Sequence, residues 1–294
     1  MVSSNNSTEV AQSILKKYVD EMPSFSPATA KIIQLANTMN APANEIVAAI
    51  RLDPVLTGRV LQLVNSAYFS LAQKVTSLNR ALVYLGINTI KNLALSTAVM
   101  QAFDTKNKAL AEEIKPIWKN SLATAVCTKN IAKLAQVPQT QIEEYFIAGL
   151  LHKIGRIILV QAFFATKPYD SGISVQEERL RYGQDHAGVA ADTLRRWKFS
   201  EDLIGGIENY LTPNKENPLS YFIHVAEAMT YRLKLNGSEE NTTEVHPIAR
   251  DSWEALKLTE KQVLSELATT AEQIEKAEIF LNIASSKEKV VEQP

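Results

Sequence analysis

Apolar residues recur at three- and four-residue spacing along most of this chain, and this periodicity constrains the fold more than any other feature. Between residues 27 and 40 the apolar positions at helical spacing are Ala30, Ile32, Ile33, Leu35 and Ala36. No convincing strand pattern appears. Glycine and proline are scarce, at 10 and 11 of 294 residues, so few positions favour a tight turn. The sequence therefore predicts an all-α protein.

Several helix boundaries can be placed from capping residues. Asp53 followed by Pro54 predicts a helix start, because the aspartate accepts hydrogen bonds from the first backbone N–H groups and proline has the φ of a first helical position. Ser77 predicts a second start, and Gly86 predicts where that helix ends. Asn44 predicts a third cap.

A charged segment at residues 104–113 separates short helices before it from longer helices after it. We therefore predict a small N-terminal helical subdomain over residues 21–105, packed on a larger helical subdomain over residues 106–286. Residues 1–20 are expected to be an N-terminal extension with a frayed start, and residues 287–294 a disordered tail. Outside the N-terminal subdomain, helices are expected at about 10–18, 116–136, 140–156, 174–197, 200–211, 217–235, 247–256, 260–270 and 271–286.

Charge and cysteine content narrow the function. A net charge of -1, from 31 basic and 32 acidic residues, provides no general attraction to nucleic acid or to an anionic membrane. The helix expected after Gly86 carries only Lys91 as a charge, so it lacks the donors of a DNA-reading helix. Cys127 is the single cysteine, which excludes an internal disulfide and a cysteine-based zinc site. With no signal peptide and no apolar stretch of membrane length, we expect a cytoplasmic protein.

The strongest functional signal is the segment Ala148–Arg156, which reads AGLLHKIGR. A motif of this shape usually has an aspartate after the histidine, and that pair binds a divalent metal. Here Lys153 holds the aspartate position, and an ammonium group repels a metal and cannot coordinate it. We interpret the segment as an apolar helix end closed by Gly155. His152 is either a core histidine or a ligand, and Lys153, with Arg156 nearby, is either a surface lysine or a phosphate-binding cation.

Further motifs in the same order resemble the HDOD family, the HD-related output domains. They are DPVLTGRVLQLVNSAYF at residues 53–69, VTSLNRALVYLG at 75–86, IWKNSLATA at 117–125, and GQDHAGVA at 183–190 followed by Trp197. The resemblance runs from about residue 22 to residue 281. It implies an HD-like helical fold related to metal-dependent phosphohydrolases.

The resemblance also implies that the metal site is incomplete. Asn120 lies where a first histidine is expected, and the segment Asn209-Tyr210-Leu211 lies where a histidine pair is often found. The remaining candidate ligands are His152, His186 and Glu227. Three ligands are too few for a stable dinuclear site that would activate water. We therefore expect no resident cofactor, and any divalent ion would have to bind those three side chains.

Three functions are compatible with this pattern. We favour a non-catalytic regulatory module that acts in signal transduction through a protein partner, with self-association left open and no nucleic-acid or membrane partner expected. The alternatives are a divergent phosphohydrolase acting on a nucleotide or cyclic dinucleotide, and a sensor of a small anion in the vestigial cleft. The residues expected to form this cleft are His152, Lys153, Arg156, Asp185, His186 and Glu227.

Some polar positions have two interpretations. Asp53, Asn65 and Ser66 flank one apolar helix and are either caps or ties between the N-terminal subdomain and the HD-like half. Asp185 before His186 is either part of the cleft or a local cap.

Overall fold

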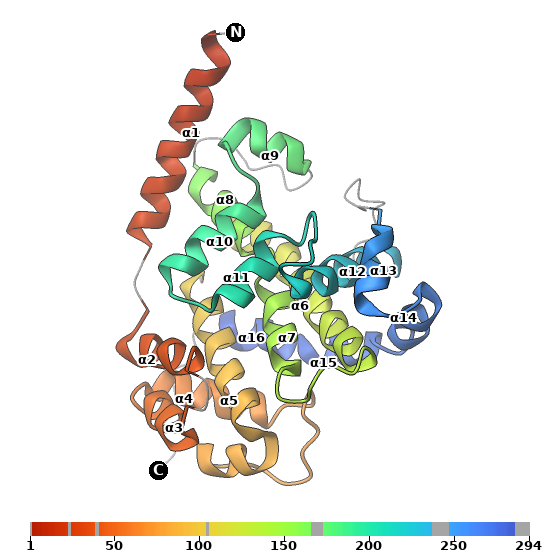
Figure 1. Cartoon of the computed structure of the whole chain (residues 1–294). Coiled ribbons are helices and arrows are strands. Elements are labelled where there is room, and N and C mark those ends of the chain that lie inside the picture. Colours follow the sequence, from red (N-terminus) through yellow and green to blue (C-terminus); the bar gives the residue numbers. More distant parts are fainter. Residues whose placement is uncertain are drawn as a thin grey trace.

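A computed structural model describes residues 2–22, 25–38, 41–103, 106–165, 173–236 and 247–285. Within these ranges every regular element is a helix, so the predicted all-α fold is confirmed. In chain order (Figure 1) the helices are α1 (Val2–Glu21), α2 (Pro27–Ala36), α3 (Ala43–Arg51), α4 (Pro54–Val64), α5 (Leu78–Ala102), α6 (Lys108–Leu134), α7 (Ile142–Leu151), α8 (Ile154–Phe163), α9 (Val175–Tyr182), α10 (His186–Arg196), α11 (Glu201–Glu208), α12 (Pro218–Arg232), α13 (Arg250–Leu256), α14 (Glu260–Leu267), α15 (Ala271–Ala277) and α16 (Ile279–Ser285).

The helices α2, α3, α4 and α5 form an N-terminal group. They pack on one another through fully buried side chains such as Ile32, Ile50 and Leu56. The helix α16 packs on α4 and α5, although these two helices are distant from α16 in the sequence (Figure 1). The end of the described chain thus packs on the N-terminal group, and the division near residue 105 stays a prediction.

The helix α6 organises the second half. It packs against α7, α8, α12, α14 and α15. A Cβ atom added to Gly149 of α7 would lie 2.6 Å from the Cα of Ala125, so α6 and α7 meet backbone to backbone. The helix α10 packs on α8 and α11, and α11 packs on α12. This arrangement directs residues from α7, α8, α10 and α12 into one interior.

Two capping predictions and one break are confirmed. The Asp53 carboxylate accepts a hydrogen bond from the backbone N–H of Leu56 at 2.9 Å, at the start of α4. Ser77 caps α5 in the same way. Gly86 has a φ of +76° and kinks α5, which continues as a helix on the other side. Glycine suits this backbone because it has no Cβ.

Other predicted boundaries are wrong. Asn44 lies inside α3, which follows Pro42 instead, a residue whose restricted φ suits a helix start. The helix predicted at 140–156 is α7 and α8, divided at His152 and Lys153. The helix predicted at 174–197 is α9 and α10, divided at Gly183, which has a φ of +80°. Apolar spacing continues across both breaks because the helices on either side bury apolar faces in the same core. The predicted tail at 287–294 lies outside the described residues.

The helix α1 is not a frayed extension. It begins at Val2 and packs on α8 and α9, in the second half of the molecule (Figure 1). The Tyr18 hydroxyl donates to Gln161 Oε1 at 2.8 Å, and Arg196 pairs with Asp20 at 2.8 Å. Docking on α8 and α9 stabilises the part of α1 that contacts them. Extending the helix from there toward Val2 costs little, because the costly step is forming the first turn.

The stretch Ile142–Phe163 is apolar and long enough to cross a membrane by length and composition, contrary to our sequence expectation. In the structure it is the α7–α8 pair, and 89% of its most apolar window is buried inside the protein.

Candidate functional site

His152 and Lys153 occupy the break between α7 and α8, and both side chains are buried. His152 Nδ1 lies 2.6 Å from the carbonyl oxygen of Gly149. Because a carbonyl only accepts, Nδ1 carries the hydrogen and Nε2 is left as an acceptor. Burial lowers the pKa of His152, although Glu227 opposes that effect, so the ring is neutral at pH 7.

Glu227 of α12 faces this break from the opposite side. Lys153 Nζ donates to Glu227 Oε1 at 2.7 Å and to the Tyr231 hydroxyl at 2.7 Å. The ammonium also lies 4.9 Å from the centre of the Tyr231 ring, within reach of a cation–π interaction. Burial by itself would raise the pKa of Glu227, but the Lys153 ammonium lowers this pKa well below its usual value. Lys153 is only 2% exposed, so this is a buried ion pair and not a surface lysine.

A second buried cluster is centred on Glu178 of α9. Arg156 Nε donates to Glu178 Oε1 at 3.1 Å. His186 donates to Glu178 Oε2 from Nδ1 at 2.6 Å and from its backbone N–H at 2.9 Å. The sequence analysis missed Glu178, because it lies in the charged segment QEERLRY, where exposure to solvent is the ordinary expectation.

Gly155 makes this second cluster possible. A Cβ atom added to it would lie 1.8 Å from the carbonyl oxygen of His186 and 2.8 Å from the backbone nitrogen of Ala190. The helices α8 and α10 therefore cross backbone to backbone at Gly155, next to Arg156. Gly155 lies inside α8 and does not close a helix, which corrects the sequence interpretation.

Tyr210 connects the two clusters. Its hydroxyl hydrogen-bonds to His186 Nε2, and its ring packs edge-on against His152 with the centroids 5.1 Å apart. His186 therefore contacts Glu178 through Nδ1 and Tyr210 through Nε2. The Tyr210 carbonyl oxygen also lies 2.9 Å from His224 Nδ1. A phenol thus fills the place where the resemblance implies a histidine pair.

The structure divides the six predicted cleft residues into three groups. His152, Lys153 and Glu227 form one cluster, whereas Arg156 and His186 belong to the other. Asp185 is a helix cap, as its second interpretation proposed. It accepts from the backbone N–H of Gly188 at 2.9 Å and pairs with Arg179 at 2.6 Å.

Of the three residues considered for subdomain coupling, Asp53 and Asn65 form hydrogen bonds within the N-terminal group. Asn65 holds the loop after α4, because its side chain donates to the Val75 carbonyl oxygen at 2.8 Å and accepts from the Val75 N–H at 2.7 Å. Asp53 caps α4. The buried Ser66 hydroxyl has no hydrogen-bond partner among the described residues.

Tyr68 makes the contact between the halves that the sequence did not indicate. Its ring packs on Phe146 of α7 and Phe280 of α16, with centroids 6.1 and 5.5 Å away. Lys129 of α6 lies 5.6 Å from the ring centre and pairs with Glu143 at 2.8 Å. An aromatic residue in a loop carries no sequence signal that names its distant partners.

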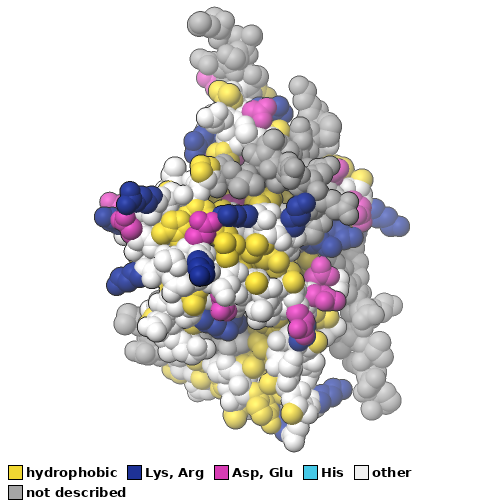
Figure 2. Space-filling view, turned by 90° about the vertical axis from the view of Figure 1, so that its right-hand side faces the viewer, with side chains coloured by type: hydrophobic (Ala, Val, Ile, Leu, Met, Phe, Trp, Pro, Cys, Tyr) yellow, Lys and Arg dark blue, Asp and Glu magenta, His cyan; other side chains and the backbone are white. Residues whose placement is uncertain are grey.

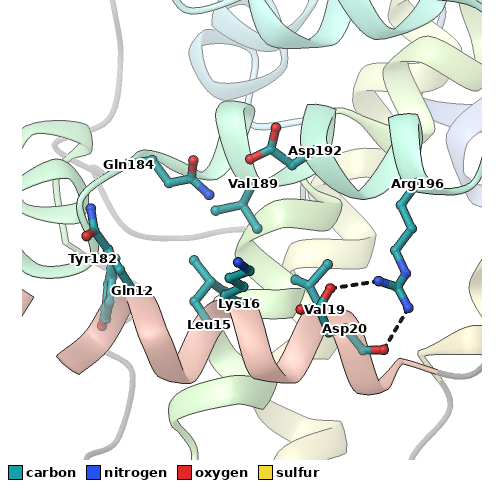
Figure 3. Close-up of a pocket in the computed structure, with 10 residues that line it drawn as sticks. All are labelled: Gln12, Leu15, Lys16, Val19, Asp20, Tyr182, Gln184, Val189, Asp192 and Arg196. Carbon is teal, nitrogen blue, oxygen red and sulfur yellow. Dashed lines mark hydrogen bonds and ion pairs between the residues drawn. The ribbon is translucent and has the colours of Figure 1, made fainter. Parts of the chain in front are cut away.

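Both ion clusters lie inside the protein. The face in Figure 2 shows apolar, basic and acidic side chains but no histidine, in keeping with the burial of His152 and His186. A separate cavity of about 460 Å³ lies between α1 and α10 (Figure 3). Its charged lining residues are exposed, and among them Asp20 and Arg196 pair with each other, so this cavity is a solvent-exposed groove.

The two clusters do not fit a divalent metal. His152 Nε2 is an available acceptor 3.7 Å from Glu227 Oε1, but the Lys153 ammonium already binds that oxygen. His186 uses both ring nitrogens in hydrogen bonds. Across the described part of the chain, no three His, Cys, Asp or Glu side chains are grouped so that they could hold an ion. In both clusters a cation of the chain neutralises a carboxylate of the chain, Lys153 with Glu227 and Arg156 with Glu178.

The all-helical architecture matches that of a solved HDOD domain protein. The HDOD domain family matches residues 22–213, and the chain belongs to this family. The predicted resemblance is therefore confirmed.

Solved structures share the fold. An HDOD domain protein with unknown function from Geobacter sulfurreducens has a TM-score of 0.69 at 21% identity, covering 92% of this chain and 97% of that one. A candidate phosphohydrolase from Shewanella amazonensis SB2B has a TM-score of 0.67 at 23% identity, covering 92% and 98%. A candidate signal transduction protein from Marinobacter aquaeolei VT8 has a TM-score of 0.73 at 16% identity, covering 95% and 66%.

A curated relative is similar over part of its length. An uncharacterized protein of Treponema pallidum is 25% identical over 209 residues, which make up 68% of this chain and 39% of that protein. The chain therefore matches about two fifths of the length of this relative.

The burial and pairing of Glu178 lead us to expect that the free energy of unfolding falls in acid. Burial would raise its pKa, but the charges of His186 and Arg156 lower it from 4.5 to about 2. A carboxyl group whose pKa is lower in the folded state stabilises the fold above the unfolded pKa, and this stabilisation disappears as the pH falls from 4.5 toward 2. The expected loss is about 3 kcal/mol over that window.

Urea unfolding at a series of pH values measures this loss. Glu178→Gln removes the titration, so its stability should fall less steeply than that of the wild type between pH 4.5 and 2. Parallel slopes in the two proteins would contradict the pairing of Glu178 with His186 and Arg156.

Proposed function

We propose that this chain is a non-catalytic regulatory module of the HDOD family that acts in signalling through a protein partner. One observation carries the proposal, namely the 2.7 Å contact between the Lys153 ammonium and Glu227. The lysine supplies, as a covalent part of the chain, the positive charge that a metal would bring to this carboxylate. Without a bound metal there is no metal-activated water to attack a phosphodiester.

The pairing of Arg156 with Glu178 also supports a structural role for the buried charges. Arg156 compensates the buried Glu178, so both cations of the vestigial cleft already oppose carboxylates inside the protein. A small anion at Lys153 and Arg156 would have to compete with these partners in a low-dielectric interior. The geometry therefore supports the anion-sensor alternative less than the regulatory module.

A divergent phosphohydrolase is the second candidate, and His152 is the observation in its favour. Its Nδ1–H is held by a backbone carbonyl while Nε2 is left as an acceptor, which is the arrangement of a metal-ligating histidine. Lys153 is the observation against it.

Metal content separates the two candidates. The protein is purified without chelator, and iron, manganese, nickel and zinc are measured by mass spectrometry together with hydrolysis of a chromogenic phosphodiester. We expect far less than one equivalent of metal and no hydrolysis. The variants His152→Ala and His224→Ala are compared, because both histidines are buried but only His152 is a candidate ligand.

About one equivalent of metal that is lost in His152→Ala and kept in His224→Ala, together with hydrolysis, would overturn the proposal. A metal-free protein with an intact thermal unfolding transition supports it. The search for a protein partner would then begin from that folded, metal-free protein.

A further inference from the structure

A cleft with buried polar lining lies where the N-terminal group meets the second half. Its walls come from α2 and α5 on one side and from α7, α11 and α12 on the other. Four of its polar lining residues are Lys91, Asn92, Glu144 and Asp202. The cleft has a volume of about 60 Å³ and opens to solvent at its exposed lining residues.

Lys91 is a buried cation with weak compensation. It lies on α5 and is 8% exposed, although lysine is seldom buried without a close partner. Glu144 Oε1 is the carboxylate oxygen within reach, and it lies 4.0 Å from Lys91 Nζ, too far for a hydrogen bond. Burial lowers the pKa of Lys91 because Glu144 compensates the charge only partly.

Asn92 adds a second donor at the same place. It follows Lys91 on α5, is 5% exposed and lines the same cleft. Within the described residues its Nδ2 has no hydrogen-bond partner. The ammonium of Lys91 and the amide of Asn92 line the same cleft and are both donors, and charge-assisted hydrogen bonds to a carboxylate are strong.

The cleft also carries negative charge. Glu144 and Asp202 line it and are both exposed to solvent, which places them toward its opening. Burial of part of the Glu144 side chain raises its pKa, and the Asp202 carboxylate adds to this effect. A ligand ammonium would be attracted by both carboxylates. The apolar part of the lining includes Leu95, Ile147 and Leu203.

We propose that this cleft binds a small zwitterion of the α-amino-acid class. The ligand carboxylate meets Lys91 and Asn92, its ammonium meets Glu144 and Asp202, and an apolar side chain lies along the wall. A ligand held this way bridges α5 and α7, so it stabilises one packing of the two halves over others. This site goes beyond the regulatory role proposed above and does not depend on the metal result.

The ligand test uses the full chain and isothermal titration calorimetry with L-alanine, L-valine, L-leucine and L-methionine. At least one of these is expected to bind. Its N-acetyl derivative lacks the ammonium, and the corresponding decarboxylated amine lacks the carboxylate. Each should bind about tenfold more weakly or worse, because one charged contact is lost. Absence of binding by all four amino acids, or equal binding of either derivative, overturns the proposal.

The variant test removes the buried ammonium. Lys91→Met keeps the apolar stem and should weaken binding about tenfold or more, while the thermal midpoint stays the same or rises because a poorly compensated buried charge is gone. Lys115→Met is the matched control, since Lys115 is exposed on α6 with a carboxylate oxygen 3.9 Å away. Asn92→Leu is a second variant should Lys91→Met not fold. Unchanged affinity in either cleft variant overturns the proposal.

Discussion

Replacing Lys153 by methionine should destabilise the protein by about 3–5 kcal/mol. Methionine preserves most of the side-chain volume but removes the ammonium that contacts Glu227 at 2.7 Å. The Glu227 carboxylate would then be buried opposite a neutral His152, with no cation to compensate it. Urea unfolding at pH 7 measures the change in the free energy of unfolding.

Two controls separate the loss of the ion pair from a general effect of the substitution. The double variant Lys153→Met with Glu227→Gln removes both charges and should recover much of the lost stability, because a neutral amide is less costly to bury. Lys119→Met removes a lysine that is 43% exposed and 3.6 Å from Glu278, and should cost less than about 1 kcal/mol. A cost for Lys153→Met as small as that of Lys119→Met would show that Glu227 does not depend on this lysine.

Gly155→Ala should destabilise the protein by about 3 kcal/mol or more, near the upper end of the usual cost of overpacking. The added methyl group would lie 1.8 Å from a backbone oxygen of α10, and a backbone atom cannot move aside as a flexible side chain can. Either α8 and α10 separate or the helices deform, and both outcomes disturb the contact between Arg156 and Glu178. The free energy of unfolding is again the measured quantity.

The matched control is a helical glycine with free space around it. At Gly188 of α10 the nearest atom to an added Cβ would be 3.6 Å away. Gly188→Ala should therefore stabilise the protein by about 0.5–1 kcal/mol, through the higher helix propensity of alanine. Equal effects of the two substitutions would mean that α8 and α10 do not touch at Gly155.

The interior of the protein contains two buried ion pairs. Glu227 and Glu178 are buried carboxylates, each neutralised by a cation that belongs to the chain. A bound metal can be exchanged or removed, whereas Lys153 and Arg156 cannot. We therefore expect an interior that is locked in one charge arrangement over the pH range in which both carboxylates stay ionised. Such an interior supports the fold, and we propose that regulation depends instead on the surface and on the cleft at Lys91.

Much of the helical framework could be predicted from the sequence, because its signals are local. The Asp53 cap and the Gly86 break depend on residues within one turn of each other. The breaks at His152–Lys153 and Gly183 were missed because apolar periodicity continues across them. Lys153 was identified as the altered position from its place in a short motif, but a motif does not show what a side chain contacts.

By itself, the sequence determined the all-α class, the family resemblance and the presence of a lysine where that resemblance implies a metal-binding carboxylate. Only the tertiary structure decided which partner each charge meets. Arg156 and Glu178 are 22 residues apart in the chain, and His186 and Tyr210 are 24 apart. Their contacts depend on the crossing of α8 and α10 at Gly155 and on the docking of α12. Helix propensity acts between neighbours in the sequence, whereas charge compensation in a buried site depends on helices brought together by the whole core.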